Sequence, residues 1–164
     1  MDTDSLNADA QIRTLVHRLF RALDERAFSP GWMRAHVTPD ARMETPLGNS
    51  EGDEAVRQTE RALGRYERTQ HIASGILTDV GTGTATASWN ALMTHVHRED
   101  TLRALGPDTE PLFVVGGHYE ADLCLTPGGW RFRRIAVRPV WTKGRPPLLP
   151  PTDGSRAPHR SPQP

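Results

Sequence analysis

The segment TQHIAS, residues 69–74, marks the position at which the sequence pattern of this chain changes. Upstream of it, apolar residues recur every three or four positions, a spacing typical of helices with one buried face. Downstream of it, apolar and polar residues alternate, as they do in half-buried strands. Helices followed by a run of strands predict an α+β fold. We therefore expect His71 to lie near the start of a strand, where the helical layer meets the sheet.

Three helices are predicted upstream of this segment. The first spans residues 8–26, and its buried face is formed by Ile12, Leu15, Val16, Leu19, Phe20 and Leu23. A break at residues 29–31 ends it, and a short second helix is predicted over residues 32–37. A short strand over residues 41–45 then precedes a third helix over residues 52–66.

Downstream of the segment, four strands form a predicted antiparallel meander. They span residues 71–80, 84–97, 112–125 and 130–141. Tight turns rich in glycine join the first pair and the last pair, and the polar stretch 98–111 is predicted to be a flexible loop. Prolines occur at seven positions from Gly144 onward. We therefore divide the chain into one domain, residues 1–143, and a disordered tail, residues 144–164.

Length and charge restrict the classes of function. The chain has 164 residues, enough for one domain with a core. Lys plus Arg and Asp plus Glu both number 20, so neither nucleic acid nor a membrane surface is an expected partner. No apolar stretch is long enough to span a membrane, and the N-terminus lacks the pattern of a secretion signal. Cys124 is the single cysteine, which suits a reducing compartment. We expect a cytoplasmic protein that binds a small molecule.

Common cofactor motifs are missing from the sequence. Gly81-Thr82-Gly83 joins two predicted strands, whereas a dinucleotide-binding motif precedes a helix. His95 and His97 share one face of a predicted strand, and with His71 they are the candidates for a zinc site. We expect the first two at the solvent edge, and no carboxylate stands at a suitable spacing for a third ligand. We therefore predict neither a metal nor an organic cofactor.

Asp24 and His71 are the residues with the clearest chemical potential. Asp24 lies on the flank of the first predicted helix, beside Phe20 and outside the centre of the buried stripe. There it either looks into a cavity or forms a surface ion pair with Arg21 or Arg26. A carboxylate that orients a neutral histidine makes an acid/base unit that needs no cofactor. The same pair also occurs as a structural hydrogen bond, so the sequence leaves both roles open.

Several short motifs, taken in order, resemble the SnoaL-like branch of the NTF2-like superfamily. They are Ala22-Leu23-Asp24-Glu25-Arg26, Asp40-Ala41, Thr69-Gln70-His71, Gly117-His118-Tyr119, Gly129-Trp130-Arg131-Phe132 and Trp141-Thr142-Lys143-Gly144. The resemblance covers roughly residues 6–144. It implies a cone-shaped α+β fold, in which a bent antiparallel β-sheet wraps around three N-terminal helices and leaves a cavity open at one end. Members often dimerise through the sheet, so a homodimer is the expected assembly.

The resemblance also implies roles for individual residues. Scytalone dehydratase and bile-acid dehydratase belong to this branch, and they use an Asp of the first helix and a strand His to remove water from a ring that bears a carbonyl. These two roles fall on Asp24 and His71. The dehydratases commonly carry a Tyr one turn before the Asp, where this chain has Phe20. Their second strand histidine has no clear counterpart here.

We therefore predict a cofactor-independent lyase, isomerase or cyclase that acts on a hydrophobic, oxygenated small molecule, such as a polyketide-like intermediate of secondary metabolism. Dehydration is the expected reaction, with His71 moving the proton and Asp24 orienting it or acting as the second acid/base. Tyr119 or Asn90 would polarise the substrate. The predicted cavity wall comprises Phe20, Trp32, Met43, Trp89, Asn90, Met93 and Tyr119.

Two alternative functions remain open at this point. The first is an epoxide-opening or pyran-forming cyclase, in which carboxylates such as Asp24 and Asp122 carry out the proton transfers and His71 is secondary. The second is a non-catalytic ligand-binding or assembly protein, in which the cavity is a receptacle or the sheet is a docking surface. This second alternative predicts a cavity filled by side chains, or an Asp24 that faces solvent.

Overall fold

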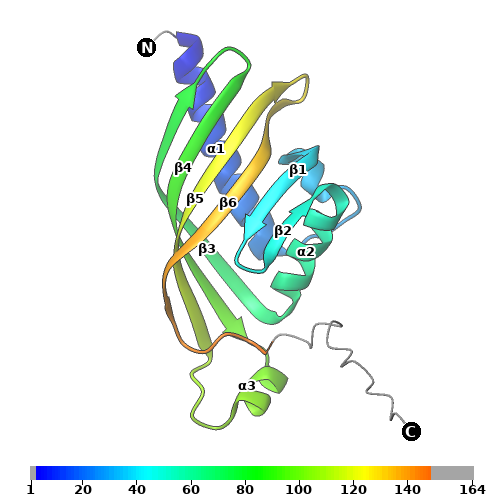
Figure 1. Cartoon of the computed structure of the whole chain (residues 1–164), viewed down its shortest axis with the longest axis vertical. Helices are drawn as coiled ribbons and strands as arrows, with labels where there is room; N and C mark the ends of the chain where they lie inside the picture. The colour runs from blue at the N-terminus through cyan, green and yellow to red at the C-terminus, as the bar shows by residue number, and fades with distance from the viewer. Residues whose placement is uncertain (1–2, 149–164) are drawn as a thin grey trace, which may run out of the picture.

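A computed structural model describes residues 3–148 and shows a six-stranded sheet with a long helix against it (Figure 1). In chain order the elements are α1 (Thr3–Glu25), the 3-10 helix η1 (Trp32–Ala35), β1 (Val37–Thr45), β2 (Gly48–Glu51), α2 (Gly52–Gly64), β3 (Tyr66–Val80), β4 (Thr84–His97), α3 (Glu99–Leu105), β5 (Leu112–Thr126) and β6 (Gly129–Lys143). The α+β class predicted from the sequence is confirmed.

The sheet has the strand order β2-β1-β6-β5-β4-β3. Strands β3 to β6 form the predicted antiparallel meander, whereas β1 pairs with β6 in parallel. The sheet is therefore mixed and not wholly antiparallel as expected. The parallel pair joins β1 to β6, the last strand, so that β1 and β2 extend the meander and α2 lies next to them (Figure 1).

Helix α1 packs on the sheet through the apolar stripe predicted from the sequence. Its buried residues are Ile12, Leu15, Val16, Leu19, Phe20 and Leu23. Burial of such side chains stabilises the fold by about 1.5–3 kcal/mol each, so this stripe is a main attachment of the helix. The contacts of α1 are mostly with β3, and the helix crosses behind the strands in Figure 1. Its last turn thereby comes close to the first half of β3.

Strand β4 follows the predicted alternation along its whole length. It spans Thr84–His97, as predicted, and every second side chain from Ala85 to His97 is buried. Successive residues of a strand point to opposite faces of the sheet. The face with Ala85 is therefore the inner face, which carries Trp89 and Met93, and the face with Asn90 is the outer one.

The segment after α1 differs from the prediction. The predicted second helix is the short 3-10 helix η1, and β1 begins at Val37 and continues through Pro39. Proline cannot donate a hydrogen bond to a neighbouring strand. Pro39 is tolerated because the β1–β6 ladder is interrupted between Val37 and Arg42, and β2 pairs with β1 only from Arg42 onward. Strand β2 lies between the predicted strand and the third predicted helix, where the sequence predicted no strand.

Strand β3 and the segment after β4 also differ from the prediction. Strand β3 begins at Tyr66, five positions before His71, and the predicted loop 98–111 contains α3. Helix α3 is the third α-helix of the described chain, so the three helices are not all N-terminal. It has a single buried residue, Leu105. It therefore lacks the apolar stripe by which a helix is recognised in a sequence.

The chain keeps a defined path for a few residues beyond β6, where disorder was expected from Gly144. His97 Nε2 donates to the carbonyl of Arg145 at 2.9 Å, and Arg145 Nη1 donates to the carbonyl of Leu105 at 2.7 Å. The rest of the predicted tail, residues 149–164, lies outside the described residues. Among residues 3–148, no helix has the length and apolar character needed to cross a membrane.

Candidate active site

A cavity of about 470 Å³ lies between α1, α2 and the inner face of the sheet. Its apolar wall includes Leu19, Phe20, Leu23, Met33, Met43, Leu63, Met93, Val115 and Ile135. Arg65 is the only lysine or arginine among the lining residues that the structure describes. Such a wall suits a neutral, apolar ligand. The cavity is open, whereas the assembly alternative predicted one filled by side chains.

Asp24, at the end of α1, meets His71 on β3 beside this cavity. The His71 Nδ1 lies 2.6 Å from Oδ1 of Asp24. The same carboxylate accepts the backbone N–H of His71 through Oδ2 at 2.8 Å and the Thr69 hydroxyl through Oδ1 at 2.9 Å. Three donors from the segment 69–74 therefore hold one carboxylate.

The hydrogen bonds determine which form each partner takes. Burial favours the neutral form of the Asp24 carboxyl, but the hydrogen bonds from the His71 ring, the His71 backbone and Thr69, with the charge of His71, outweigh burial and lower the pKa of Asp24. Asp24 is thus an ionised acceptor at neutral pH. The proton of a neutral His71 ring then lies on Nδ1, which leaves Nε2 with a free lone pair. Nε2 makes no hydrogen bond to any described residue.

His71, and not Asp24, forms part of the cavity wall. The His71 side chain is 5% exposed and lines the cavity, whereas the Asp24 side chain is 21% exposed and is absent from the lining. Phe20 packs against the His71 ring with 5.3 Å between the centroids. Asp24 therefore acts on the cavity through His71, which is the arrangement of an oriented base.

The surface ion pairs that the sequence left open for Asp24 are not formed. Arg21 pairs instead with Glu25, with Nε 2.7 Å from Oε1. Arg26 Nη1 donates to the backbone carbonyl of Tyr66 at 2.7 Å. Both arginines are thus engaged elsewhere, and Asp24 keeps His71 as its ionisable hydrogen-bond partner.

His95 is the second histidine of the cavity wall. Its Nδ1 donates to the carbonyl of Phe113 at 3.0 Å, and its ring centroid lies 6.0 Å from that of His71. Burial lowers the pKa of His95 to about 4, although the hydrogen bond to Phe113 opposes the shift. His95 is therefore neutral near pH 7, and its Nε2 is a hydrogen-bond acceptor.

The predicted place of His95 and His97 at the solvent edge is wrong. They are 9% and 3% exposed, because both point to the inner face of β4. His97 does not line the cavity, and its Nε2 bonds the carbonyl of Arg145. Within residues 3–148, no three His, Cys, Asp or Glu side chains are grouped as a metal site requires.

Of the seven predicted wall residues, the ones that line the cavity are Phe20, Met43, Met93 and Tyr119. The Tyr119 hydroxyl donates to Met93 Sδ at 3.2 Å, and burial raises the pKa of Tyr119. Tyr119 is thus a packed and hydrogen-bonded part of the wall.

The other three predicted wall residues lie elsewhere. Trp32 donates its Nε1–H to Glu60 at 2.8 Å, and Trp89 is 1% exposed in the core, where its ring stacks on Tyr119. Asn90 points to the outer face of β4 and contacts His118. Side-chain parity on β4 already separates Asn90 from the inner face, so it is not a candidate to contact a ligand in this cavity.

Tyr66 lines the cavity, although the sequence placed it on the third predicted helix. It is the first residue of β3, opposite His97, and the pairing register shifts between Tyr66 and Arg68. In a regular strand, residues five positions apart point to opposite faces. The shift turns Tyr66 to the same face as His71, and no sequence period could reveal this.

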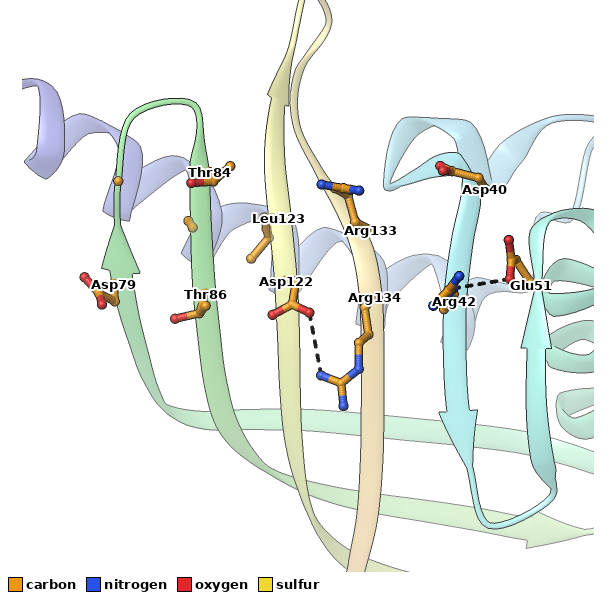
Figure 2. A pocket seen from close by; sticks show the side chains of 12 residues that line it. Asp40, Arg42, Glu51, Asp79, Thr84, Thr86, Asp122, Leu123, Arg133 and Arg134 are labelled. Carbon is orange, nitrogen blue, oxygen red and sulfur yellow. Dashed lines mark hydrogen bonds and ion pairs between the residues drawn. The ribbon is translucent and has the colours of Figure 1, made fainter.

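A second hollow, of about 640 Å³, lies on the outer face of the sheet near the β3–β4 turn (Figure 2). Two ion pairs lie among its charged side chains: Arg134 Nη1 is 3.8 Å from Asp122 Oδ2, and Arg42 Nε is 3.2 Å from Glu51 Oε2. Asp122 is therefore on the opposite face of the sheet from Asp24. The two carboxylates named for the cyclase alternative do not share a site.

The sequence matches the SnoaL-like domain family over residues 4–136. No curated protein matches the sequence. The fold is similar to a protein from Novosphingobium aromaticivorans that is assigned as a scytalone dehydratase, with a TM-score of 0.75 and 20% identity over 94% of this chain and 98% of that one.

Two further solved structures have the same fold. A hexachlorocyclohexane dehydrochlorinase from Novosphingobium barchaimii gives a TM-score of 0.72 and 17% identity, over 92% of this chain and 100% of that one. An NTF2-like superfamily protein from Salmonella enterica serovar Typhimurium gives a TM-score of 0.69 and 13% identity, over 92% of this chain and 98% of that one. At these identities the likeness is one of fold. The sequence match, which covers most of the chain, shows that it belongs to the SnoaL-like domain family.

Proposed function

We propose that this protein is a cofactor-independent lyase or isomerase that removes a proton from carbon in a hydrophobic, oxygenated small molecule, with dehydration as its reaction. One observation carries the proposal. His71 Nδ1 lies 2.6 Å from the Asp24 carboxylate, and the same histidine lines an apolar cavity. This geometry supports a histidine whose second nitrogen is a base toward the cavity.

In the proposed reaction, His71 Nε2 takes a proton from a carbon next to a carbonyl group. The electrons of the C–H bond form an enolate and then a C=C bond, while the C–O bond of the neighbouring carbon breaks. The leaving hydroxyl takes the proton from the His71 imidazolium, so one water molecule leaves and the ring returns to its neutral form. Asp24 remains ionised, stabilises the charged ring and keeps the Nδ1–H turned away from the substrate.

The leaving group is proposed from the polar groups in the cavity. The names of two structural neighbours, scytalone dehydratase and hexachlorocyclohexane dehydrochlorinase, suggest elimination of either water or hydrogen chloride. His95 Nε2 is an acceptor, because its Nδ1 donates to Phe113. A substrate hydroxyl can donate to this nitrogen, whereas a carbon-bound chlorine has no proton to donate. This favours loss of water.

The proposal is tested by turnover of a panel of β-hydroxy ring ketones, followed by the absorbance of the conjugated product. Wild type is expected to convert at least one of them, and His71→Ala should lower the rate about 10²- to 10⁴-fold, as expected for loss of a general base. His118→Ala is the matched control, because His118 lies on the outer face of the sheet. If His71→Ala retains turnover within a few-fold of wild type, the base is assigned wrongly.

A further inference from the structure

An enolate mechanism needs a hydrogen-bond donor for the oxygen that gains charge. The sequence suggested Tyr119 or Asn90 for this task, and the structure leaves neither available. The Tyr119 hydroxyl is bonded to Met93, and Asn90 is on the outer face of β4. The donor of the cavity must therefore come from another residue.

Most other donors on the cavity wall are already engaged or exposed. The hydroxyls of Thr45 and Thr59 donate to the carbonyls of Gly48 and Ala55. Thr142 is exposed near the end of β6. Tyr66 differs from these residues, because it is only 8% exposed and its hydroxyl bonds no residue that the structure describes.

We propose that the Tyr66 hydroxyl is the cavity's donor to substrate, and that it donates to the substrate's carbonyl oxygen. This inference rests on the proposed function, because it names the group that would stabilise the enolate formed by His71. A tyrosine hydroxyl is a neutral donor, which suits the apolar wall better than a cation would.

Two contacts fix the position of Tyr66, one at its ring and one at its backbone carbonyl. Its ring packs on His95 with 4.4 Å between centroids, and its carbonyl accepts the hydrogen bond from Arg26. His95 is in turn held by the carbonyl of Phe113 and lies beside His71. The donor, the neutral acceptor and the base thus follow one another along one wall of the cavity.

The ionisation of Tyr66 agrees with this role. Burial raises the pKa of Tyr66 to about 12, so the hydroxyl keeps its proton at neutral pH. A donor that stays protonated can stabilise a developing enolate without a change in its own charge.

Binding of two matched probes, 1-tetralone and its carbonyl-free analogue tetralin, tests the inference on the full chain by isothermal titration calorimetry. Wild type is expected to prefer the ketone. Tyr66→Phe should lower the ketone affinity about three- to tenfold, as for loss of one neutral hydrogen bond, and leave tetralin affinity unchanged. His118→Ala, on the outer face of the sheet, is the control and should keep the preference. An unchanged preference in Tyr66→Phe would overturn the inference.

A second readout separates contact from a structural role. The chain has two tyrosines, so in Tyr119→Phe the ring-carbon NMR signal of the remaining tyrosine belongs to Tyr66. The ketone should shift the signal of Cζ, the carbon that bears the hydroxyl, more than tetralin does, because only the ketone accepts its hydrogen bond. If the shift appears but His71→Ala has no effect on any turnover, the donor assignment stands and the proposed reaction fails. If turnover depends on His71 but the signal does not move, only the donor assignment fails.

Discussion

The Asp24 carboxylate accepts three hydrogen bonds, two of them from His71. This number matters because a carboxylate that leaves water must regain its hydrogen bonds within the protein. The donors come from β3, 45 and 47 positions away in sequence. Asp24 therefore joins the end of α1 to the start of the sheet, in addition to its proposed role in orienting His71.

Asp24→Asn is expected to lower the free energy of unfolding at pH 7 by about 1.5–3 kcal/mol, the usual worth of hydrogen bonds to a charged group. Because the folded pKa of Asp24 is lowered, its stabilisation is complete above the ordinary pKa of an aspartate and is lost as pH falls through the lowered value. The difference from wild type should therefore shrink in acid. Urea unfolding across this pH range measures it.

The control for this prediction is Asp108→Asn, a substitution of an exposed aspartate after α3. It should change the free energy of unfolding by no more than about 0.5 kcal/mol. If Asp24→Asn lowers the free energy of unfolding by the same amount from neutral to acid pH, the charge of Asp24 does not contribute to stability.

The sequence identified Asp24 and His71 as candidates but left open whether Asp24 contacts His71 or a neighbouring arginine. Helical periodicity placed Asp24 on the flank of α1, and the change of period placed His71 close to the start of a strand. Whether the carboxylate turned to a histidine or to an arginine depended on the packing angle between α1 and β3, which no local pattern encodes. Tyr66 was missed for a related reason, because the register shift beside it changes its face.

At the scale of elements, the end of α1 contains an unusual backbone conformation. Arg26 has φ +52°, in the left-handed region that favours glycine. Its N–H bonds the carbonyl of Ala22 at 3.1 Å, a common way to end a helix. Its Nη1 bonds the Tyr66 carbonyl, while Nε and Nη2 are buried without a partner among the described residues. The helix end therefore combines backbone strain with a cross-link to β3.

Arg26→Gly is expected to be more stable than Arg26→Ala by about 1 kcal/mol, because both lose the cross-link and only glycine relieves the left-handed backbone. Urea unfolding of the two variants measures the difference. Arg21→Gly and Arg21→Ala, inside α1, are the matched controls. There the alanine variant should be more stable than the glycine variant by about 0.5–1 kcal/mol. If alanine is also the better residue at position 26, the backbone is not strained.

The elements that the sequence predicted well are those whose burial is regular. Strand β4 was predicted at both ends, because its side chains alternate from Ala85 to His97. Strand β2 and helix α3 were missed, because β2 is four residues long and has no buried residue, and α3 buries only Leu105. These elements form through neighbours in space, namely the pairing of β2 with β1 and the contact of Arg145 with Leu105.

At the scale of the whole molecule, the outer face of the sheet carries an apolar row. Ile72 on β3 is opposite Leu92, Leu92 is opposite Gly116, and Gly116 is opposite Trp141 on β6. The three side chains are 50%, 38% and 50% exposed. Trp141 lies over Gly116, where an added Cβ would come within 2.2 Å of the indole. A row of this kind is typical of a surface that another molecule covers.

We propose that a second copy of the chain covers this row, which gives the homodimer expected from the family resemblance. The chain has no net charge, so two copies do not repel one another at long range. The row is on the face opposite the cavity, so pairing does not need the side chains of the cavity wall. Sedimentation of the full chain at micromolar concentration should show a dimer.

Leu92→Lys is expected to weaken this dimer at least tenfold, because it would bury an unpaired charge at the centre of the interface. Leu125→Lys is the control, because Leu125 is 53% exposed near the end of β5 and away from the row. A wild-type chain that sediments as a monomer at tens of micromolar would contradict the proposed interface.

Deuterium incorporation next to the carbonyl of 1-tetralone, followed by proton NMR in D₂O, tests the pairing of His71 with Asp24 most directly. It requires only that the base removes a proton from carbon, whatever the natural substrate is. Wild type is expected to accelerate the exchange, and both His71→Ala and Asp24→Asn should lower it by about 10² or more. Exchange at the wild-type rate in His71→Ala, or no exchange by wild-type protein that demonstrably binds the ketone, would contradict acid/base catalysis by this pair.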